Sequence, residues 1–98
     1  MADLDVVAVL TAKPGSEETV GTALRALVGP TMGEEGCFAY DLYESAATPG
    51  TFVTIERWRN QADLDAHMQS EHVAAAVGAV GDHLGEAPAI HPLRPAGP

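Results

Sequence analysis

The chain has 98 residues, of which 46% are hydrophobic, and it carries a formal charge of −9 with only five lysines and arginines. This composition is that of one folded domain rather than a disordered chain. The charge argues against nucleic acid as a partner, because phosphate binding needs basic patches, and no apolar run approaches the roughly 20 residues of a membrane span.

The start of the chain, MADLDVV, is acidic and lacks the basic beginning and apolar core of a signal peptide. The single cysteine, Cys37, permits no internal disulfide. Both features favour a reducing, cytoplasmic location.

The first two expected elements are a strand and a helix. Residues 3–11 (DLDVVAVLT) are largely apolar on both faces, whereas a strand covered on one side alternates more cleanly. Ser16 is a suitable N-cap for the following helix, whose first turn is acidic. We expect this helix to run to about Val28 and to end at Gly29-Pro30.

Two further strands follow, joined by a hairpin connection that ends in Pro-Gly. Residues 37–44 (CFAYDLYE) predict a strand with Phe38, Tyr40 and Leu42 on one face. Residues 51–58 (TFVTIERW) predict the third strand. One face of this strand carries Phe52, Thr54, Glu56 and Trp58.

The remainder of the chain predicts two helices and a last strand. Asn60 is a good N-cap for a short helix, and Ser70 can cap a longer one that covers residues 72–84. A short strand over residues 87–93 and a tail over residues 94–98 complete the chain. One face of the short helix carries Leu64, His67 and Met68.

This order of elements, β-α-β-β-α-β, is typical of the α+β ferredoxin-like fold, in which both helices cover one face of the sheet. The other face would be bare in a monomer. Because the first three strands are apolar on both faces, we expect a homodimer packed sheet to sheet.

The most specific pattern in the chain spans the third strand and the helices after it. It consists of Glu56-Arg57-Trp58, Leu64, His67, Ser70 and His72, preceded on the second strand by Gly36-Cys37 and Tyr40-Asp41-Leu42. With these residues the chain resembles the antibiotic biosynthesis monooxygenase family, including its quinol monooxygenase-like members. The resemblance implies one domain over residues 4–93 and a dimeric α/β barrel.

The resemblance also implies a function. Some members of this family oxidise hydroquinones or polycyclic phenols with O2 and without a metal or flavin, whereas others degrade haem or isomerise small molecules. Haem-degrading relatives use an asparagine on the first strand and a histidine on the last long helix. The expected first strand contains no asparagine, and residues 74–80 contain no histidine. Haem degradation is therefore disfavoured. We therefore expect a cofactor-independent monooxygenase that acts on a small aromatic molecule.

His67 is the candidate catalytic residue, as a general base. The ordinary pKa of an imidazole, near 6.5, suits the deprotonation of an acidic phenol. The alternative is a helix histidine that pairs with Glu71. On a continuous helix His72 would lie about 140° around the axis from His67. No third ligand follows at a recognisable spacing, so no metal site is predicted.

Six further side chains are candidates for substrate binding. They are Trp58, Glu56, Tyr40, Phe52, Met68 and His72. The aromatic residues have the alternative of packing in the core or a dimer interface, and Glu56 has the alternative of pairing with an arginine or capping a helix. We expect Cys37 to be a small buried residue rather than a nucleophile.

Two other classes of function stay open: a non-enzymatic small-molecule-binding dimer and an isomerase of a small metabolite. The lining of the cavity would distinguish these functions. Aromatic walls with one or two polar groups favour oxygenation, a filled cavity favours the non-enzyme, and a polar cavity favours isomerisation.

Overall fold

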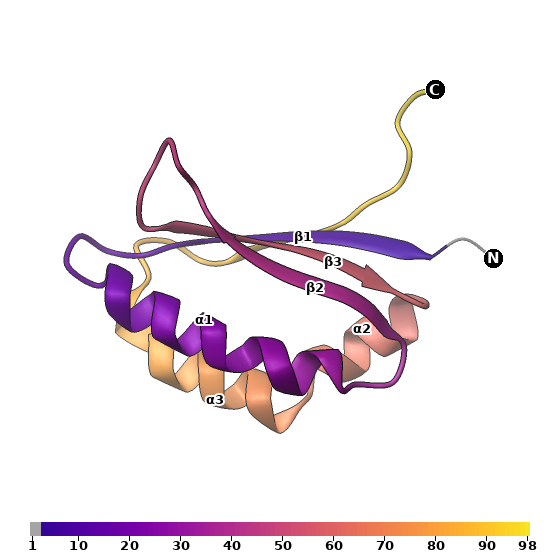
Figure 1. Ribbon diagram of the computed structural model, residues 1–98, viewed down its shortest axis with the longest axis horizontal. Coiled ribbons are helices and arrows are strands. Elements are labelled where there is room, and N and C mark those ends of the chain that lie inside the picture. The colour runs from indigo at the N-terminus through magenta and orange to yellow at the C-terminus, as the bar shows by residue number, and fades with distance from the viewer. Residues whose placement is uncertain (1–2) are drawn as a thin grey trace.

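The computed structural model describes residues 3–98 and packs one layer of helices against one four-stranded sheet (Figure 1). The elements in chain order are β1 (Leu4–Thr11), α1 (Glu17–Met32), β2 (Cys37–Glu44), β3 (Thr51–Trp58), α2 (Gln61–Met68), α3 (Glu71–Val80), the 3₁₀ helix η1 (Gly81–His83) and β4 (Ala89–Pro92). The strand order is β2-β3-β1-β4, and all neighbours are antiparallel. The predicted ferredoxin-like fold is confirmed, with α2 and α3 together in the place of the second helix.

Strand β3 shows how the sequence pattern builds the sheet. Phe52, Thr54, Glu56 and Trp58 point toward the helices and are all buried, whereas Ile55 on the other face is 50% exposed. Two of the four buried side chains are polar, although the buried face of a strand is normally apolar. This departure from the pattern makes the middle of β3 a candidate for a functional site.

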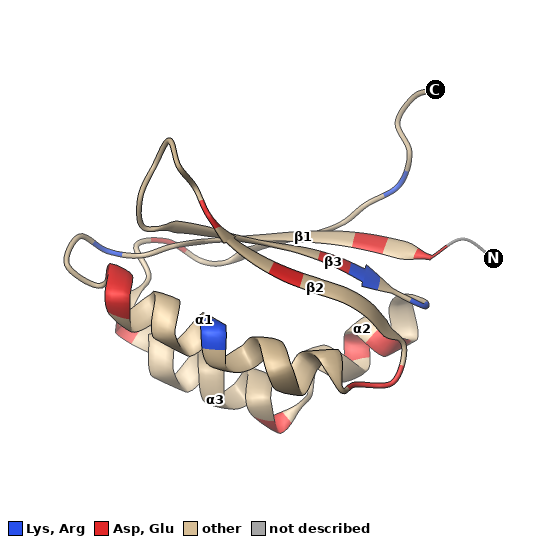
Figure 2. Cartoon of the chain, in the orientation of Figure 1, with Lys and Arg blue, Asp and Glu red and all other residues tan. Residues whose placement is uncertain are grey.

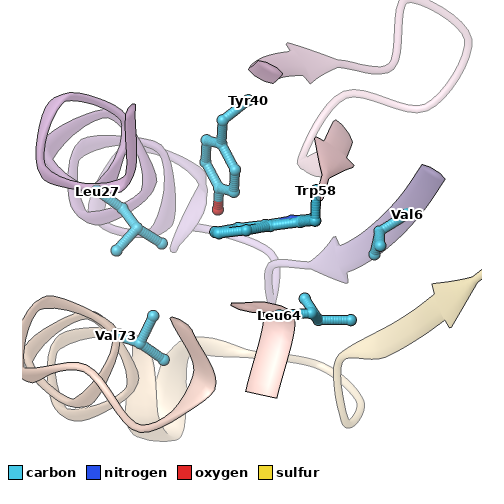
Figure 3. Close-up of a cluster of buried hydrophobic side chains, with 6 residues drawn as sticks. All are labelled: Val6, Leu27, Tyr40, Trp58, Leu64 and Val73. Atoms are coloured by element: carbon cyan, nitrogen blue, oxygen red, sulfur yellow. The ribbon is translucent and has the colours of Figure 1, made fainter. Parts of the chain in front are cut away.

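The core has two clusters of buried side chains between the sheet and the helices. The first, drawn in Figure 3, contains Val6, Leu27, Tyr40, Trp58, Leu64 and Val73. The second contains Ala12, Val20, Leu24, Phe52 and Val80. Each cluster joins residues of α1 and α3 to residues of the sheet, so the packing fixes both helices over the same face.

Helix α1 continues through Pro30 to Met32, so its predicted end at Gly29-Pro30 is wrong. The fixed φ of proline fits a helix, and its missing N–H removes one helical hydrogen bond. Thr31 is fully buried, and the N–H of Gly33 closes the last turn on the carbonyls of Gly29 and Pro30. Burial of the last turn therefore outweighs the local stop signal.

A β-bulge at the start of β2 shifts its register against β3 between Cys37 and Ala39. The extra residue, Phe38, is 51% exposed, whereas Tyr40 is buried. The prediction that Phe38 shares a face with Tyr40 and Leu42 is therefore wrong, because a bulge breaks the alternation of side chains.

The C-terminal elements are shorter than predicted. Helix α3 ends at Val80 rather than near residue 84, because Gly81 leaves the helical conformation and η1 follows. Strand β4 covers Ala89–Pro92 within the expected range of 87–93. In the part of the chain that the structure describes, no helix is long and apolar enough to cross a membrane.

Candidate active site

A cavity with a volume of about 300 Å³ lies between the sheet and the helices. Most of its wall is aliphatic and comes from β1, α1, α3 and the segment around β4. A cavity of this size and lining suits a small, largely apolar ligand that is oriented by a few polar contacts. Its polar groups come from Tyr40, Thr54, Glu56 and His67.

Helix α2 fixes the direction of His67. Asn60 caps this helix as predicted, and its side chain accepts a hydrogen bond of 2.9 Å from the N–H of Asp63. Leu64 and His67, three residues apart, face inward and are 3% and 4% exposed. The ring of His67 packs on the indole of Trp58 with a centroid distance of 4.8 Å.

The partner of His67 is Glu34, from the loop between α1 and β2, rather than Glu71. Oε2 of Glu34 lies 2.5 Å from Nδ1 of His67 and 2.7 Å from Nε2 of His72. Figure 2 shows this acidic loop beside α2. One carboxylate oxygen therefore contacts two imidazole rings.

The second ring nitrogen of His67, Nε2, makes no protein hydrogen bond among the described residues. In that part of the chain, the one fully buried side-chain polar atom without a partner is Oγ1 of Thr31. Nε2 is therefore not fully buried, and it lies across the imidazole ring from the nitrogen that Glu34 contacts, in a side chain that lines the cavity. This nitrogen is the site's most accessible candidate for proton transfer.

His72 reaches Glu34 because the chain breaks between α2 and α3. The hydroxyl of Ser70 donates to the carbonyl of His67 at 2.7 Å and accepts from the N–H of Val73 at 3.3 Å, which caps α3. On a continuous helix the two histidines would lie about 140° apart around the axis. The break changes the direction of the chain, so both side chains can reach Glu34. As a result, the rings of His67 and His72 lie 6.0 Å apart, centroid to centroid.

Gly36 allows the loop with Glu34 to approach α2. Its φ of 81° is a conformation that favours glycine, and a Cβ at this position would collide with the carboxylate of Asp63. The carbonyl of Gly36 accepts a hydrogen bond of 2.8 Å from the N–H of Arg59. The glycine therefore helps to bring Glu34 to His67.

Glu34, His67 and His72 are the one group of three metal-ligating side chains that the described residues bring together, with ligand atoms within 4.8 Å of one another. Spacing along the chain indicated no third ligand, but the fold brings one from a distant loop. Ligands of one tetrahedral zinc ion, at about 2.0–2.2 Å from the metal, lie roughly 3.3–3.5 Å apart. The separations of 2.5 and 2.7 Å are shorter than that and correspond to direct, short hydrogen bonds between the side chains.

Glu56 is 5% exposed, and both of its carboxyl oxygens have partners. Oε1 accepts a hydrogen bond of 2.9 Å from Nε1 of Trp58, and Oε2 accepts one of 2.5 Å from the hydroxyl of Thr54. These partners take the place of the arginine or helix cap considered from the sequence. Because Thr54 and Glu56 also line the cavity, they can contact a polar group of a ligand.

Two other titratable side chains lie near these carboxylates. Burial raises the pKa of Tyr40 above its ordinary range, and the neighbouring Glu56 adds to the rise. Burial, followed by the charges of Glu34 and Glu56, raises the pKa of Cys37 to about 11. At neutral pH Tyr40 is therefore a neutral phenol, and Cys37 is not a thiolate nucleophile.

Four of the predicted site residues line the cavity, namely His67, Glu56, Tyr40 and Met68. Thr54, which was not predicted, also lines it. Its position between Phe52 and Glu56 on the inner face of β3 was the available signal.

Three predicted substrate-binding residues lie off the cavity wall. Trp58 and Phe52 are core residues at the two ends of β3, 0% and 4% exposed, whereas the cavity lies over the middle of this strand. His72 lines a separate hollow between α1 and α3. For Trp58 and Phe52 the structure favours the packing role that was the alternative.

The chain is similar in sequence to known proteins. Residues 4–79 match the family model described as antibiotic biosynthesis monooxygenase. Over 90 residues the chain is 37% identical to the Mycobacterium tuberculosis protein named "Putative monooxygenase Rv0793", with 92% of this chain and 88% of that protein covered. Over 92 residues it is 34% identical to the Escherichia coli protein named "Probable quinol monooxygenase YgiN", with 83% and 88% covered.

Solved structures of related proteins share the fold of this chain. The structure of Rv0793 superposes with a TM-score of 0.88 at 34% identity, covering 99% of this chain and 98% of that one. The structure of PA3566 from Pseudomonas aeruginosa superposes with a TM-score of 0.90 at 33% identity, covering 99% and 97%.

Proposed function

The chain belongs to the antibiotic biosynthesis monooxygenase family, and on that premise we propose that it is a cofactor-independent monooxygenase. Its substrate in this proposal is a phenol, a hydroquinone or a polycyclic aromatic molecule, which it oxidises with O2 and without a metal or flavin. The names of the relatives support a monooxygenase function, and the name of the Escherichia coli relative specifies quinols.

The observation that carries this proposal is the placement of His67 at the wall of an apolar cavity, with Nδ1 held by Glu34 and Nε2 open. In the proposed reaction Nε2 takes the proton of a phenolic O–H. The aliphatic wall holds the aromatic ring and excludes water, while Glu56 or Tyr40 hydrogen-bonds a second polar group of the substrate.

The electrons for the reaction come from the substrate. The phenolate formed by loss of the proton is electron-rich enough to reduce O2 directly, and a carbon–oxygen bond forms at the ring. Cleavage of the O–O bond then leaves one oxygen atom in the product and releases the other as water, which carries away two hydrogens of the substrate. A hydroquinone thus becomes a hydroxyquinone without any external reductant.

The cavity also bears on the alternative functions. It is open rather than filled, which disfavours a purely structural role, and its mostly aliphatic wall suits a polar metabolite poorly, which disfavours isomerisation. The aromatic wall expected for oxygenation is not found, since Tyr40 is the one phenylalanine, tyrosine or tryptophan among the described residues that line the cavity. An apolar cavity would serve a binding protein equally well. His67, with one nitrogen held and the other free, is the feature that a binding role does not require.

Oxygen consumption tests the proposed function directly. With a probe panel led by 1,4-dihydroxynaphthalene, we expect O2 uptake above the rate of autoxidation, unaffected by EDTA. With ¹⁸O₂, one labelled atom should enter the organic product and the other should appear in water. Stoichiometric hydrogen peroxide in place of a labelled product, or a bound flavin or transition metal in the purified protein, would contradict the proposal.

A homodimer is the second part of the proposal. The sheet face opposite the helices is bare in Figure 1, and on it Tyr43 and Ile55 are 55% and 50% exposed. The register of β1 and β3 places Val7, Val9 and Val53 on the same face. Asp41 lies opposite Ile55 on this face, and the ion pair between Asp5 and Arg57 lies at one end of it. Exposed apolar side chains grouped in this way are typical of an interface, and a two-fold axis through the sheet would cover them.

Light scattering tests the homodimer. At micromolar concentration the wild-type chain should give twice its mass of 10.2 kDa, and Ile55→Asp should give the single-chain mass, because two copies of the new charge would be buried near the axis. Met32→Asp, at an exposed position on the end of α1, is the control and should leave the dimer intact. A well-folded wild-type monomer would refute the sheet-to-sheet arrangement.

A further inference from the structure

We propose that Glu34 is a positioning residue for His67, and that His72 holds Glu34 in place from the surface side. Glu34 fixes the imidazole of His67 with its hydrogen on Nδ1 and its lone pair on Nε2, toward the cavity. The catalytic consequence rests on the proposed function, whereas the arrangement of the three side chains does not.

The hydrogen-bond roles follow from the chemistry of the carboxylate. Oε2 of Glu34 contacts Nδ1 of His67 at 2.5 Å and Nε2 of His72 at 2.7 Å. An ionised carboxylate only accepts hydrogen bonds, so both nitrogens must donate. A neutral imidazole that donates through Nδ1 carries its lone pair on Nε2. Glu34 therefore selects the tautomer that a base facing the cavity needs.

Exposure rises from His67 outward along this chain of contacts. The side chains of His67, Glu34 and His72 are 5%, 15% and 25% exposed, respectively. A carboxylate so shielded from water needs partners of its own, and His72 supplies the second one. Glu34 lies outside the cavity wall, so its effect on a ligand passes through His67.

The same contact is kept when His67 takes the proton of the substrate. When Nε2 takes up a proton, the ring becomes a cation that still donates to Glu34 through Nδ1, and the hydrogen bond becomes charge-assisted on both sides. Tyr40, which stays neutral, and Glu56 are the other titratable groups that line the cavity with His67. Glu34 is the carboxylate that contacts the ring directly.

The neighbouring residue Glu35 provides a matched control. It lies in the same loop, but its side chain is 85% exposed and pairs with Arg59 at 3.7 Å. Glu35→Ala therefore removes the same type of charge one position away, without touching either histidine.

Nitrogen-15 NMR of the imidazole rings tests the arrangement without any substrate. In the wild type and in Glu35→Ala, neutral His67 should carry its hydrogen on Nδ1. In Glu34→Ala, it should shift toward the Nε2–H tautomer that prevails in free histidine. An Nε2–H tautomer in the wild type, or an unchanged Nδ1–H tautomer in Glu34→Ala, would overturn the proposal.

Steady-state kinetics with 1,4-dihydroxynaphthalene test the consequence. Glu34→Ala should lower kcat on the order of 10- to 100-fold, the range known for residues that orient metal-binding histidines through the same kind of hydrogen bond, with KM little changed. Glu34→Gln keeps an acceptor oxygen but loses the charge, so its kcat should fall in between. A wild-type kcat in Glu34→Ala would overturn the proposal. Absence of turnover in the wild type would instead count against the proposed function, and the NMR result would still decide the role of Glu34.

Two variants of His72 test its part. The amide nitrogen of glutamine can replace Nε2 of His72 as a donor to Glu34, so His72→Gln should keep most of kcat, whereas His72→Ala should lower it. Equal losses in both variants would overturn the part assigned to His72.

Discussion

His67→Ala is expected to lower kcat for an accepted hydroquinone by a factor of about 100 or more, the usual scale for loss of a general base. The expectation follows from the position of the ring, which lines the cavity with Nε2 open while Glu34 holds Nδ1. The imidazole is also 4% exposed and packs on Trp58 and Tyr40, so the free energy of unfolding should fall by about 1–3 kcal/mol. Oxygen uptake measures the first quantity, and urea unfolding measures the second.

Two comparisons separate chemistry from packing in this experiment. His67→Gln keeps a polar side chain of similar reach but cannot act as a base near neutral pH, so its kcat should fall as in His67→Ala. Asp65→Ala changes an exposed residue on the same helix and should turn over normally. Normal turnover by a folded His67→Ala would show that His67 is not the base. It would favour a non-enzymatic binding dimer, unless Glu56 or Tyr40 proved necessary in the same assay.

Local sequence signals predicted most elements of the fold. β2 and β3 have the predicted bounds, because runs of aromatic and β-branched residues are flanked by turn residues. Asn60 and Ser70 cap α2 and α3 as expected, since capping depends on a few neighbouring residues. The end of α1 was missed because burial of Thr31 is a tertiary effect. The bulge at Phe38 was missed because register belongs to a pair of strands.

The candidate site was only partly predictable. His67 was identifiable because it lies on the inner face of a well-capped helix within the family-like pattern. Its partner Glu34 lies 33 positions earlier, in a loop without a periodic pattern, and only the fold brings the two together. Alternation placed Trp58 on the inner face of β3, but whether it meets the cavity or the core depends on side-chain volumes such as those of Leu27 and Leu64.

Trp58→Phe is expected to lower the free energy of unfolding by about 2–4 kcal/mol. Its effect on kcat should be smaller than this effect on stability. Trp58 is fully buried, and Figure 3 shows its ring within the first core cluster. Phenylalanine leaves a small cavity, and it removes the N–H that donates to Oε1 of Glu56. Loss of a buried partner costs about 1–3 kcal/mol, and the cavity adds to this cost. Urea unfolding at one fixed protein concentration measures the change, since the stability of a dimer depends on concentration.

A double-mutant cycle with Glu56→Gln separates these two contributions. In the Glu56→Gln background the missing donor should cost less, because a neutral amide is easier to leave unpaired than a carboxylate and its NH₂ group can donate to Thr54. We therefore expect Trp58→Phe to cost less in Glu56→Gln than in the wild type, by about 0.5–3 kcal/mol, the range for residues in contact. Asp65→Ala, at an exposed position on α2 away from the bare sheet face, should change stability by less than about 0.5 kcal/mol. Equal costs of Trp58→Phe in both backgrounds would mean that the indole acts through packing alone, and that Glu56 is held in the cavity by Thr54.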